Sequence, residues 1–400
     1  MKKVVITIKK VQKSRICKRS SMKLKFLSPI IVFLVIQPNM IHAQLETDNQ
    51  RACYTWAVVG AGLAGITALA VLIDCGIDPS TIAWIDPEFN VGRVGKYYRN
   101  VPGNVQTSRL LLYVNSCPYF NEIDSPSRDA LYTYNADEFQ LLHVIADPLN
   151  DFTTYLSNKV TPIKDVISSL EHCNDHWVLS GTDCIINAQK VVLAIGAEPK
   201  KLNYGVPVIP LDDALDKNKL AHYVNSTDCV AVFGGMHSAL LILKYLSECS
   251  VKHIVNFYID PYFYGPPGLE GATALWAKTV LEQNPPKNLV RVLSTPENRA
   301  ALLPLCTKAI YAIGYEPSSI LVDGSSRITF DEDSGIIAQD LYGIGIAFPP
   351  TGIFNGQKIA KNGLMTYLAY AKKLIPEWIT NERTLFTVDA KVEEQEIPWI

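Results

Sequence analysis

Three closely spaced glycines open the first segment whose residues suggest chemistry. Gly60, Gly62 and Gly65 follow an apolar, β-prone run, Tyr54 to Val59, and precede a helical pattern that stops at Gly76. The first glycine permits a tight turn, the second lets the backbone approach a pyrophosphate, and the third lets the helix pack on the strand. Unpaired N–H groups at the start of such a helix favour phosphate oxygens. The segment therefore predicts a dinucleotide pyrophosphate site.

An acidic residue completes this unit. The run Thr81 to Ile85 predicts a second strand, and Asp86 stands at its end, 21 residues past Gly65. A carboxylate at this point can accept a hydrogen bond from a ribose hydroxyl. Strand, glycine turn, helix, strand and terminal acid together predict a complete βαβ dinucleotide-binding unit.

A second unit of the same type begins at residue 229. Cys229 to Phe233 predicts a strand, Leu240 to Leu246 continues a helix, and His253 to Ile259 predicts the next strand. Met236 occupies the place of the middle glycine, where a Cβ hinders the approach of a phosphate. The unit is therefore either a second, nicotinamide-type site or a relic of the fold that no longer binds a nucleotide. Its candidate contacts are Gly234, Gly235, His237, Ser238 and Asp260.

Two details of the second unit bear on its ligand. His237 stands at the helix start, where it would either contact a ligand or face solvent as a cap-region histidine. No Lys or Arg lies between His253 and Lys278, and Asp260 would oppose a 2′-phosphate, so NADH is favoured over NADPH. The aromatic run Tyr262 to Tyr264 would stack on a ring or, as we favour, pack the loop.

Three further motifs carry a resemblance to a known superfamily. They are the stretch Val191 to Pro199, its echo Ile310 to Pro317, and the stretch Asp340 to Gly345. With the two glycine turns, they resemble the two-dinucleotide-binding-domain flavoproteins, which include the pyridine nucleotide-disulfide oxidoreductases and the flavin-containing monooxygenases. The resemblance covers roughly residues 54–375. It implies an α/β fold with two Rossmann-like domains, the second inserted into the first, with FAD in the first domain and NAD(P)H in the second. It also implies cofactor contacts at Gly196 and Gly345.

The chain departs from these families in three ways besides Met236. Ile346 stands where family members usually have an Asp that contacts the cofactor. The stretch Val91 to Asn100, where disulfide reductases place a cysteine pair, has no cysteine, and the nearest, Cys117, is single. Thiol exchange needs a resolving partner, so a dithiol relay is not expected. The monooxygenase signature Phe-x-Gly-x3-His-x3-Tyr/Phe is also missing, which leaves oxygen insertion open but unsupported.

The stretch 92–108 contains the candidates for catalysis. Gly92 and Gly95 are expected to bracket a turn where flavoproteins of this type approach the flavin ring. Tyr97, Asn100 and Asn104 offer aromatic and amide groups that would orient a substrate or bond the flavin edge. Loops of this composition are equally often structured turns, so the catalytic residues stay open.

Composition and charge exclude one class of partner. The 400 residues are 48% hydrophobic and 19% charged, which suits a globular chain with a substantial core. Residues 1–43 hold ten Lys or Arg and no acid, so the remainder has 27 basic against 39 acidic residues, a net charge of −12. A nucleic-acid partner is therefore not expected. His172 and Cys173 would face opposite ways on a strand, and no metal site is predicted.

The first segment is interpreted as an export signal. Lys23 and Lys25 precede an apolar run, Phe26 to Ile36, and Ala43 offers a cleavage site. This largely apolar run of eleven residues is too short for a membrane span, which needs about 20. We expect a cleaved signal and a periplasmic or secreted chain with no stable membrane span. An uncleaved anchor, or a cytoplasmic chain whose start is misassigned, is the alternative.

These landmarks predict the organisation and the activity. A helix is expected over Leu364 to Leu374, with its start facing the flavin. The expected parts are a signal peptide (1–43), the first part of the FAD domain (44–200), the second dinucleotide domain (201–320), the return to the FAD domain (321–380) and a surface tail (381–400). We expect an FAD-dependent oxidoreductase that passes hydride from NADH to oxygen or a small organic acceptor. A monooxygenase-like enzyme, or an FAD-binding sensor or scaffold without turnover, is the alternative.

Overall fold

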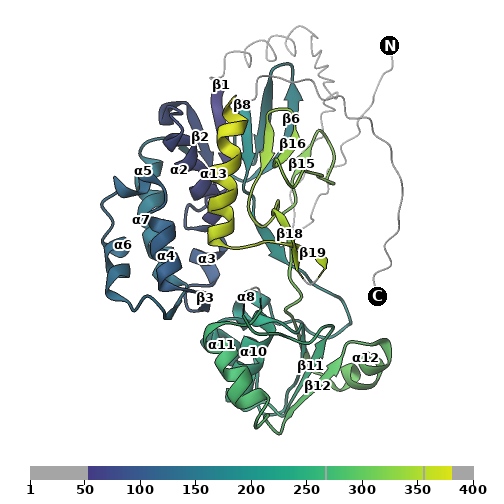
Figure 1. The fold of residues 1–400 in the computed structure, drawn as a ribbon. Coiled ribbons are helices and arrows are strands. Elements are labelled where there is room, and N and C mark those ends of the chain that lie inside the picture. The colour runs from purple at the N-terminus through teal and green to yellow at the C-terminus, as the bar shows by residue number, and fades with distance from the viewer. Residues whose placement is uncertain (1–52, 266–267, 355, 381–400) are drawn as a thin grey trace, which may run out of the picture. The chain divides into compact units, whose positions relative to one another are not determined.

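The computed structural model describes residues 53–265, 268–354 and 356–380. The predicted signal segment (1–43) and the predicted tail (381–400) lie outside the described residues. Two sheets with parallel central strands, one larger and one smaller, form the framework (Figure 1). The chain is therefore of the α/β class, as predicted.

Within the described residues, the larger sheet has nine strands. Its path runs β15-β6-β7-β8-β1-β2-β5, and β17 pairs with both β16 and the last residues of β8. The pairs β1–β2, β1–β8, β2–β5 and β8–β17 are parallel, whereas β6, β7 and β8 form an antiparallel meander. The strands are β1 (Cys53–Val59), β2 (Ile82–Ile85), β5 (Thr161–Ile163), β6 (Ile167–Cys173), β7 (His176–Gly181), β8 (Ile185–Leu193), β15 (Leu321–Val322), β16 (Ile336–Ala338) and β17 (Leu341–Gly343).

Both faces of β1 are buried, which explains its almost continuous apolar sequence. Trp56 and Val58 pack into the core beneath the helices, whereas Ala57 and Val59 pack into the core of the opposite face. Helices α2 and α13 belong to the first of these cores (Figure 1). The helices of this part are α2 (Leu63–Asp74), α3 (Gly92–Tyr97), α4 (Thr107–Val114), α5 (Pro118–Asn121), α6 (Pro126–Ala130), α7 (His143–Ser157) and α13 (Leu364–Thr380), with 3₁₀ turns η2 (Pro79–Thr81) and η3 (Leu131–Thr133).

The smaller sheet has four parallel strands in the order β12-β11-β10-β13. Val230 and Val232 of β10 pack under α10, and the alternate residues Ala231 and Phe233 pack on the other face. The elements are β10 (Cys229–Phe233), β11 (His253–Tyr258), β12 (Leu289–Leu293), β13 (Lys308–Tyr311), α8 (Leu211–Ala214), α9 (Lys217–Tyr223), α10 (His237–Glu248), α11 (Gly271–Trp276), the π-helical turn η4 (Ala277–Leu281), α12 (Pro296–Leu302) and η5 (Leu303–Leu305).

The smaller sheet interrupts the larger one in the sequence. Strands β1, β2 and β5 to β8 precede it and β15 to β17 follow it. The chain leaves through β9 (Ala197–Pro199) and returns through β14 (Tyr315–Pro317), and these two short strands form an antiparallel pair. The second Rossmann-like unit is thus inserted into the first, whereas the exact domain limits at 200/201 and 320/321 stay a prediction.

One local expectation was wrong, and another was confirmed with a longer extent. The predicted turn between Gly92 and Gly95 is the helix α3, followed by β3 (Pro102–Gln106), which pairs with β4 (Phe139–Leu141). The predicted helix over 364–374 continues to Thr380 as α13, and it is preceded by a hairpin of β18 (Thr351–Phe354) and β19 (Gln357–Ala360). Across the described ranges no helix combines the length and apolar character needed to cross a bilayer.

Candidate functional site

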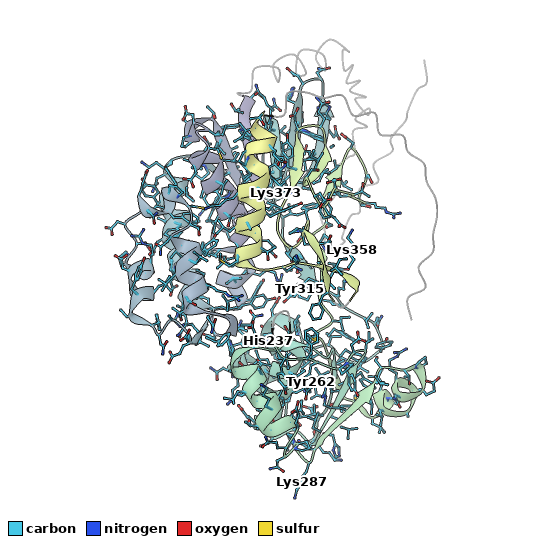
Figure 2. All side chains as sticks on the ribbon, in the orientation of Figure 1. His237, Tyr262, Lys287, Tyr315, Lys358 and Lys373 are labelled. Carbon is cyan, nitrogen blue, oxygen red and sulfur yellow. The ribbon has the colours of Figure 1, made fainter. Side chains whose placement is uncertain are left out.

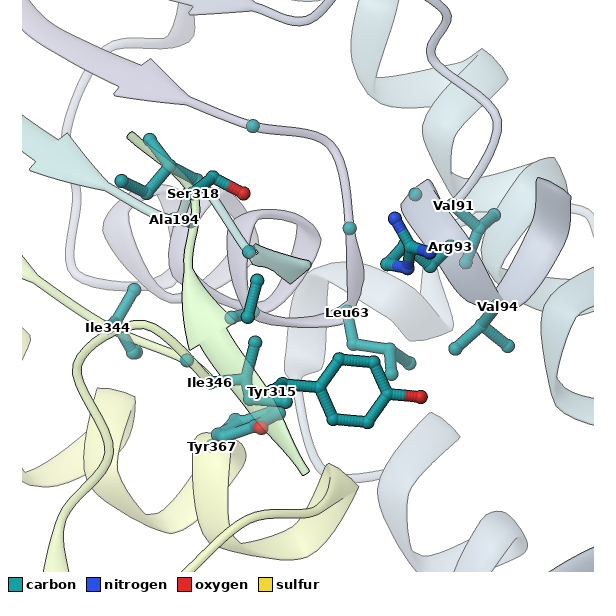
Figure 3. Close-up of a pocket in the computed structure, with 18 of the residues that line it drawn as sticks. Leu63, Val91, Arg93, Val94, Ala194, Tyr315, Ser318, Ile344, Ile346 and Tyr367 are labelled. Carbon is teal, nitrogen blue, oxygen red and sulfur yellow. The ribbon is translucent and has the colours of Figure 1, made fainter. Parts of the chain in front are cut away.

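A cavity of about 480 Å³ lies where four strands of the larger sheet end. It is lined by residues that directly follow β1, β2, β8 and β17, and open α/β sheets bind their ligands at this carboxyl edge. Its volume lies within the range of cofactor pockets. Figure 3 shows that side chains from the chain segments before and after the smaller sheet surround this space. The predicted cofactor residues Gly60, Gly62, Asp86, Gly196 and Gly345 all line the cavity.

The three glycines of the first turn differ in whether contacts within the protein require a glycine at that position. Gly60 has a φ of +110°, and a Cβ there would lie 2.3 Å from the carbonyl oxygen of Ala194. A Cβ on Gly65 would lie 2.0 Å from the carbonyl oxygen of Gly60, so this glycine lets α2 pack on the strand. At Gly62 the nearest atom to a Cβ would be the Cα of Gly92, 4.0 Å away. Protein contacts therefore explain Gly60 and Gly65, but not Gly62.

Helix α2 begins at this turn without a side-chain cap. Gly62 is the N-cap residue, and its backbone is extended. The first N–H groups of a helix have no partner within the helix and carry its positive dipole end, so they are suited to bind an anion. The open space at Gly62 and the uncapped helix end face the same cavity. Together they form a cradle that fits a pyrophosphate.

Asp86 has more contacts than the sequence indicated. Its Oδ2 accepts a hydrogen bond from the backbone N–H of Ala61 at 2.7 Å. Its Oδ1 accepts from the N–H groups of Glu88 and Phe89 at 2.8 and 2.7 Å. A carboxylate offers about four lone-pair sites, so these bonds leave room for one further donor. Asp86 thus fixes the turn to the end of β2 and retains the capacity to accept from a ribose hydroxyl.

Another wall of the cavity comes from the return segment, residues 344–367. Gly345 follows β17, has a φ of +93°, and a Cβ there would lie 2.7 Å from the Cβ of Ala64. Ile346 lines the cavity with an apolar side chain, where the related families usually carry Asp. Tyr367, in the first turn of α13, completes this wall (Figure 3). The wall offers a close backbone approach and an apolar surface, which fits the ring system of FAD.

A cluster of polar side chains that sequence analysis missed closes one end of the cavity. Arg93 of α3 forms ion pairs with Asp212 of α8 and with Glu198 of β9. The hydroxyl of Tyr98 donates to Asp212 at 2.5 Å and lies 3.0 Å from the hydroxyl of Tyr315. Burial raises the pKa of Tyr98 and of Tyr315, so both hydroxyls stay protonated at neutral pH. We call Arg93, Tyr98, Glu198, Asp212 and Tyr315 the polar cluster.

The three candidates for catalysis lie in different places. Asn104 lines the cavity. Tyr97 packs beside the guanidinium of Arg93, whose central carbon lies 5.0 Å from the ring centre. The amide of Asn100 donates to Asp216 at 3.3 Å, at the start of α9. Tyr97 and Asn100 are therefore not among the residues that line the cavity, whereas Arg93, Tyr98 and Tyr315 are.

The second glycine turn repeats the geometry of the first. Gly234 has a φ of +124°, and a Cβ there would lie 2.2 Å from the carbonyl oxygen of Ala312. Gly234 donates to Phe257 of β11 at 2.8 Å, just as Gly60 donates to Ile85 of β2 at 2.7 Å. The local fold of the dinucleotide-binding turn is thus present in both copies.

Met236 takes the place of Gly62 in this second turn. It is the N-cap residue of α10, with extended backbone at φ −104° and ψ −164°, close to the φ −82° and ψ −175° of Gly62. Any residue adopts this conformation, so the backbone tolerates methionine here. The side chain is 37% exposed. The two turns therefore differ at the position of Gly62, which is Met236 in the second turn, and at the position of Gly65, which is Ala239.

His237 lies in the smaller unit at the start of α10 (Figure 2). Its Nε2 lies 3.4 Å from the hydroxyl of Thr273, and its Nδ1 is buried. Burial lowers the pKa of the imidazole, which favours the neutral ring. His237 as a whole is partly exposed, so a ligand contact and a solvent-facing cap-region histidine both stay predictions. Ser238 follows in the same turn, and Asp260 is exposed after β11.

The aromatic run after Asp260 packs around a cation that sequence analysis did not consider. Arg291, from the neighbouring strand β12, places its guanidinium 4.8 Å from the ring centre of Tyr258 and 5.0 Å from that of Tyr262. Its Nε donates to Asn256 at 2.9 Å. Tyr262 and Tyr264 both donate to Glu282, which supports packing of the loop. A positive charge thus lies near this strand end although no Lys or Arg is local to it in the sequence.

Sequence comparison finds one curated relative at significant similarity. The monooxygenase AgnR1 of Paecilomyces divaricatus is 28% identical over 382 residues, which cover 80% of this chain and 97% of the relative. No family model matches the chain.

Comparison with solved structures identifies the fold of the chain. The bacillithiol disulfide reductase Bdr of Staphylococcus aureus aligns with a TM-score of 0.56 at 13% identity, covering 82% of this chain and 99% of that one. The chain has the two-domain fold of the FAD/NAD(P)-binding flavoproteins. A flavin-containing monooxygenase from Stenotrophomonas maltophilia and the ornithine N-hydroxylase of Kutzneria sp. 744 both align with a TM-score of 0.52, at 13% and 14% identity. Each alignment covers 82% of this chain and 99% of the other. At these identities the likeness establishes the flavoprotein fold alone.

Proposed function

We propose that the chain is an FAD-dependent oxidoreductase that takes electrons from NAD(P)H and delivers them to oxygen or to a small organic acceptor. The observation that carries the proposal is the cavity at the carboxyl edge of the larger sheet. There an uncapped helix start, the open side of Gly62 and the apolar wall around Ile346 meet. A bound FAD would supply the capacity to accept two electrons and pass them on, one or two at a time.

The protein's own residues bind and orient the cofactor. The N–H groups at the start of α2 would hold the pyrophosphate, and Asp86 would accept from the ribose. Gly196 and Gly345 would let the backbone approach the rest of FAD. Tyr98 and Tyr315 provide protonated hydroxyls at the end of the cavity, where they would orient a polar group of the substrate. Ile346 and Tyr367 would exclude water from the ring.

The electron donor is the finer part of the proposal. The second turn has the geometry of a dinucleotide site, but Met236 hinders it. Asp260 favours NADH, whereas Arg291 lies near the same strand end and would favour the 2′-phosphate of NADPH if its side chain turned toward it. We propose NADH as the preferred donor, since the guanidinium of Arg291 is already packed between two rings.

A monooxygenase activity is the second candidate. The curated relative, a monooxygenase, is covered over 97% of its length, and a flavin-containing monooxygenase shares the fold. The apolar cavity suits chemistry from which water must be excluded. In this case one oxygen atom of O₂ would enter the organic substrate and the other would leave as water.

The test is the visible spectrum of the purified full chain. The protein should copurify with FAD, and NADH added without oxygen should bleach the flavin absorbance faster than NADPH does. A bound flavin that neither nucleotide bleaches would favour a binding protein with a relic second site. Absence of any bound flavin, even after incubation with FAD, would overturn the proposal.

The fate of oxygen separates the two candidates. With NADH and air, an oxidase-type enzyme releases hydrogen peroxide in proportion to the NADH consumed. A monooxygenase given its substrate releases little peroxide and transfers label from ¹⁸O₂ into the product. Peroxide release that no organic compound suppresses would argue against the monooxygenase candidate.

A further inference from the structure

Two cysteines lie side by side in the smaller sheet, away from the cavity. Cys229 begins β10, and Cys306 lies two residues before β13, with their sulfur atoms 3.7 Å apart. The backbone fixes this proximity, because the N–H of Thr307 donates to the carbonyl of Cys229 at 2.8 Å where the two strands start to pair. Both sulfurs are thus held at the same end of neighbouring parallel strands.

The two thiols differ in access. Cys229 is 7% exposed, whereas Cys306 is partly exposed and lines a surface hollow between the start of the inserted unit and α12. Tyr204, Pro207 and Arg299 form other parts of that hollow. A reagent in solution can therefore reach Cys306 first, while Cys229 lies directly behind it.

The pair lies at the opposite edge of the sheet from the nucleotide-binding turn. Cys229 precedes Gly234 by five residues of extended strand, which corresponds to about 16 Å. Cysteines that pass electrons to a flavin must lie against it, and no cysteine is among the residues that line the cavity. This dithiol is therefore separate from the proposed redox site.

We propose that Cys229 and Cys306 form a reversible intramolecular disulfide when the chain meets a low-molecular-weight disulfide. The Cys306 thiolate attacks one sulfur of the small disulfide, and one small thiol leaves. The Cys229 thiolate then attacks the Cys306 sulfur of this mixed disulfide, and the second small thiol leaves. The protein loses two protons and two electrons, and the small disulfide is reduced to two thiols.

The surroundings of Cys306 set the pace of this reaction. Burial and the neighbouring Cys229 raise the pKa of the Cys306 thiol to about 12, and its Sγ–H donates to the carbonyl of Leu302 at 3.5 Å. Only the thiolate attacks, so the reaction is slow at neutral pH and accelerates about tenfold per pH unit below that pKa. The bond also closes a loop across 77 residues, which restricts the unfolded chain.

The experiment treats the reduced full chain with oxidised glutathione at pH 7 and pH 9. Remaining thiols are then alkylated, and the disulfide-linked peptides are identified by mass spectrometry. We expect a peptide pair that contains Cys229 and Cys306, formed about a hundredfold faster at pH 9 than at pH 7. Dithiothreitol should restore two alkylatable thiols, and the oxidised protein should unfold at a higher temperature than the reduced one.

Matched variants test the assignment. Cys306→Ser should abolish the linked pair and the rise in unfolding temperature, while Cys75→Ser, which removes an exposed cysteine at the end of α2, should leave both unchanged. Alkylation of Cys229 and Cys306 to completion after the pH 9 treatment of the wild type would overturn the proposal. Oxidation that links either cysteine to a different partner would also overturn it. Neither outcome depends on a bound flavin.

Discussion

At the scale of single residues, Gly60 of the first turn is required by the fold, whereas Gly62 is not and is a candidate ligand contact. A methyl group on Gly60 would collide with the carbonyl oxygen of Ala194, whereas one on Gly62 would meet no protein atom closer than 4.0 Å. The conformation of Gly62 is also accessible to any residue. A substitution at Gly62 therefore tests the ligand contact alone.

Gly62→Ala should lower FAD affinity at least tenfold, because its Cβ would face the pyrophosphate. The unfolding temperature of the FAD-free protein should stay within about 2 °C of the wild type, since no protein contact is lost. Fluorescence titration with FAD and thermal unfolding measure the two effects. Gly60→Ala serves as the comparison and should destabilise the FAD-free protein itself. Unchanged FAD affinity in Gly62→Ala would place the pyrophosphate elsewhere.

Met236→Gly should increase the rate of anaerobic flavin reduction by NADH, because it opens the side from which the second pyrophosphate approaches. The backbone of Met236 already matches that of Gly62, so the fold tolerates the change, at a cost of about 1 kcal/mol in unfolded-chain entropy. Stopped-flow absorbance measures the rate over a range of NADH concentrations.

Met236→Ala is the control for this substitution. Alanine removes the long side chain but keeps the Cβ, so it should recover less of the rate than glycine does. An equal gain in both variants would assign the hindrance to side-chain length. No change in either, in a protein that NADH already reduces, would contradict the idea of a hindered second site.

At the scale of elements, one buried carboxylate holds two loops of the larger sheet together. Asp165 lies between β5 and β6 and accepts hydrogen bonds from the backbone N–H groups of residues 182 to 184, in the turn between β7 and β8. It also accepts from its neighbour Val166 and from the thiol of Cys184. Burial raises the pKa of Asp165, but these donors outweigh it and hold the pKa at about 2.

Asp165→Asn should lower the free energy of unfolding at pH 7 by about 3 kcal/mol, since an amide accepts fewer and weaker bonds from these donors. The folded-state pKa is depressed, so the stabilisation is complete above the unfolded pKa of about 4 and is lost as the pH falls toward 2. Urea unfolding at pH 7, 4 and 3 should show the gap between wild type and variant narrow with acidity. A gap that stays constant would contradict the assignment.

Sequence patterns predicted the elements of the two glycine-turn units but missed others, among them α3. The apolar runs and glycine turns placed β1, α2, β10 and β11 within one to three residues of their ends, because each has a buried face and a defined turn. In α3, Gly92 and Gly95 suggested a turn. A Cβ on Gly95 would lie 1.9 Å from the carbonyl oxygen of Asn90, so this glycine permits close packing of a helix. Sequence alone does not distinguish these two uses of glycine.

At the scale of the whole molecule, the polar cluster joins parts that are distant in sequence. Arg93 and Asp212 are 119 residues apart, and Tyr98 and Tyr315 are 217 apart. Such contacts arise because one unit is inserted into the other, and no local sequence pattern predicts them. The glycine contacts of the candidate site were therefore predictable, whereas its polar end was not.

A double-mutant cycle of Tyr98→Phe and Asp212→Asn tests this cluster. Each single change should destabilise the protein, because the charge-assisted hydrogen bond between the two side chains is lost. Their effects should be non-additive, with a coupling energy of about 1 to 3 kcal/mol in urea unfolding. Tyr223→Phe removes a different tyrosine bond, to Asp213, and should add independently with Asp212→Asn. A coupling near zero for Tyr98 and Asp212 would show that the contact does not stabilise the fold.

The pairing of β9 with β14 brings the two ends of the inserted segment together. Pro199 and Tyr315 are partners across this antiparallel pair, so the two ends of the inserted segment lie about 5 Å apart. A tight two-residue turn spans that gap. The 115 residues between them therefore leave and re-enter the larger unit at neighbouring points, so the insertion leaves both flanks of the cavity close together.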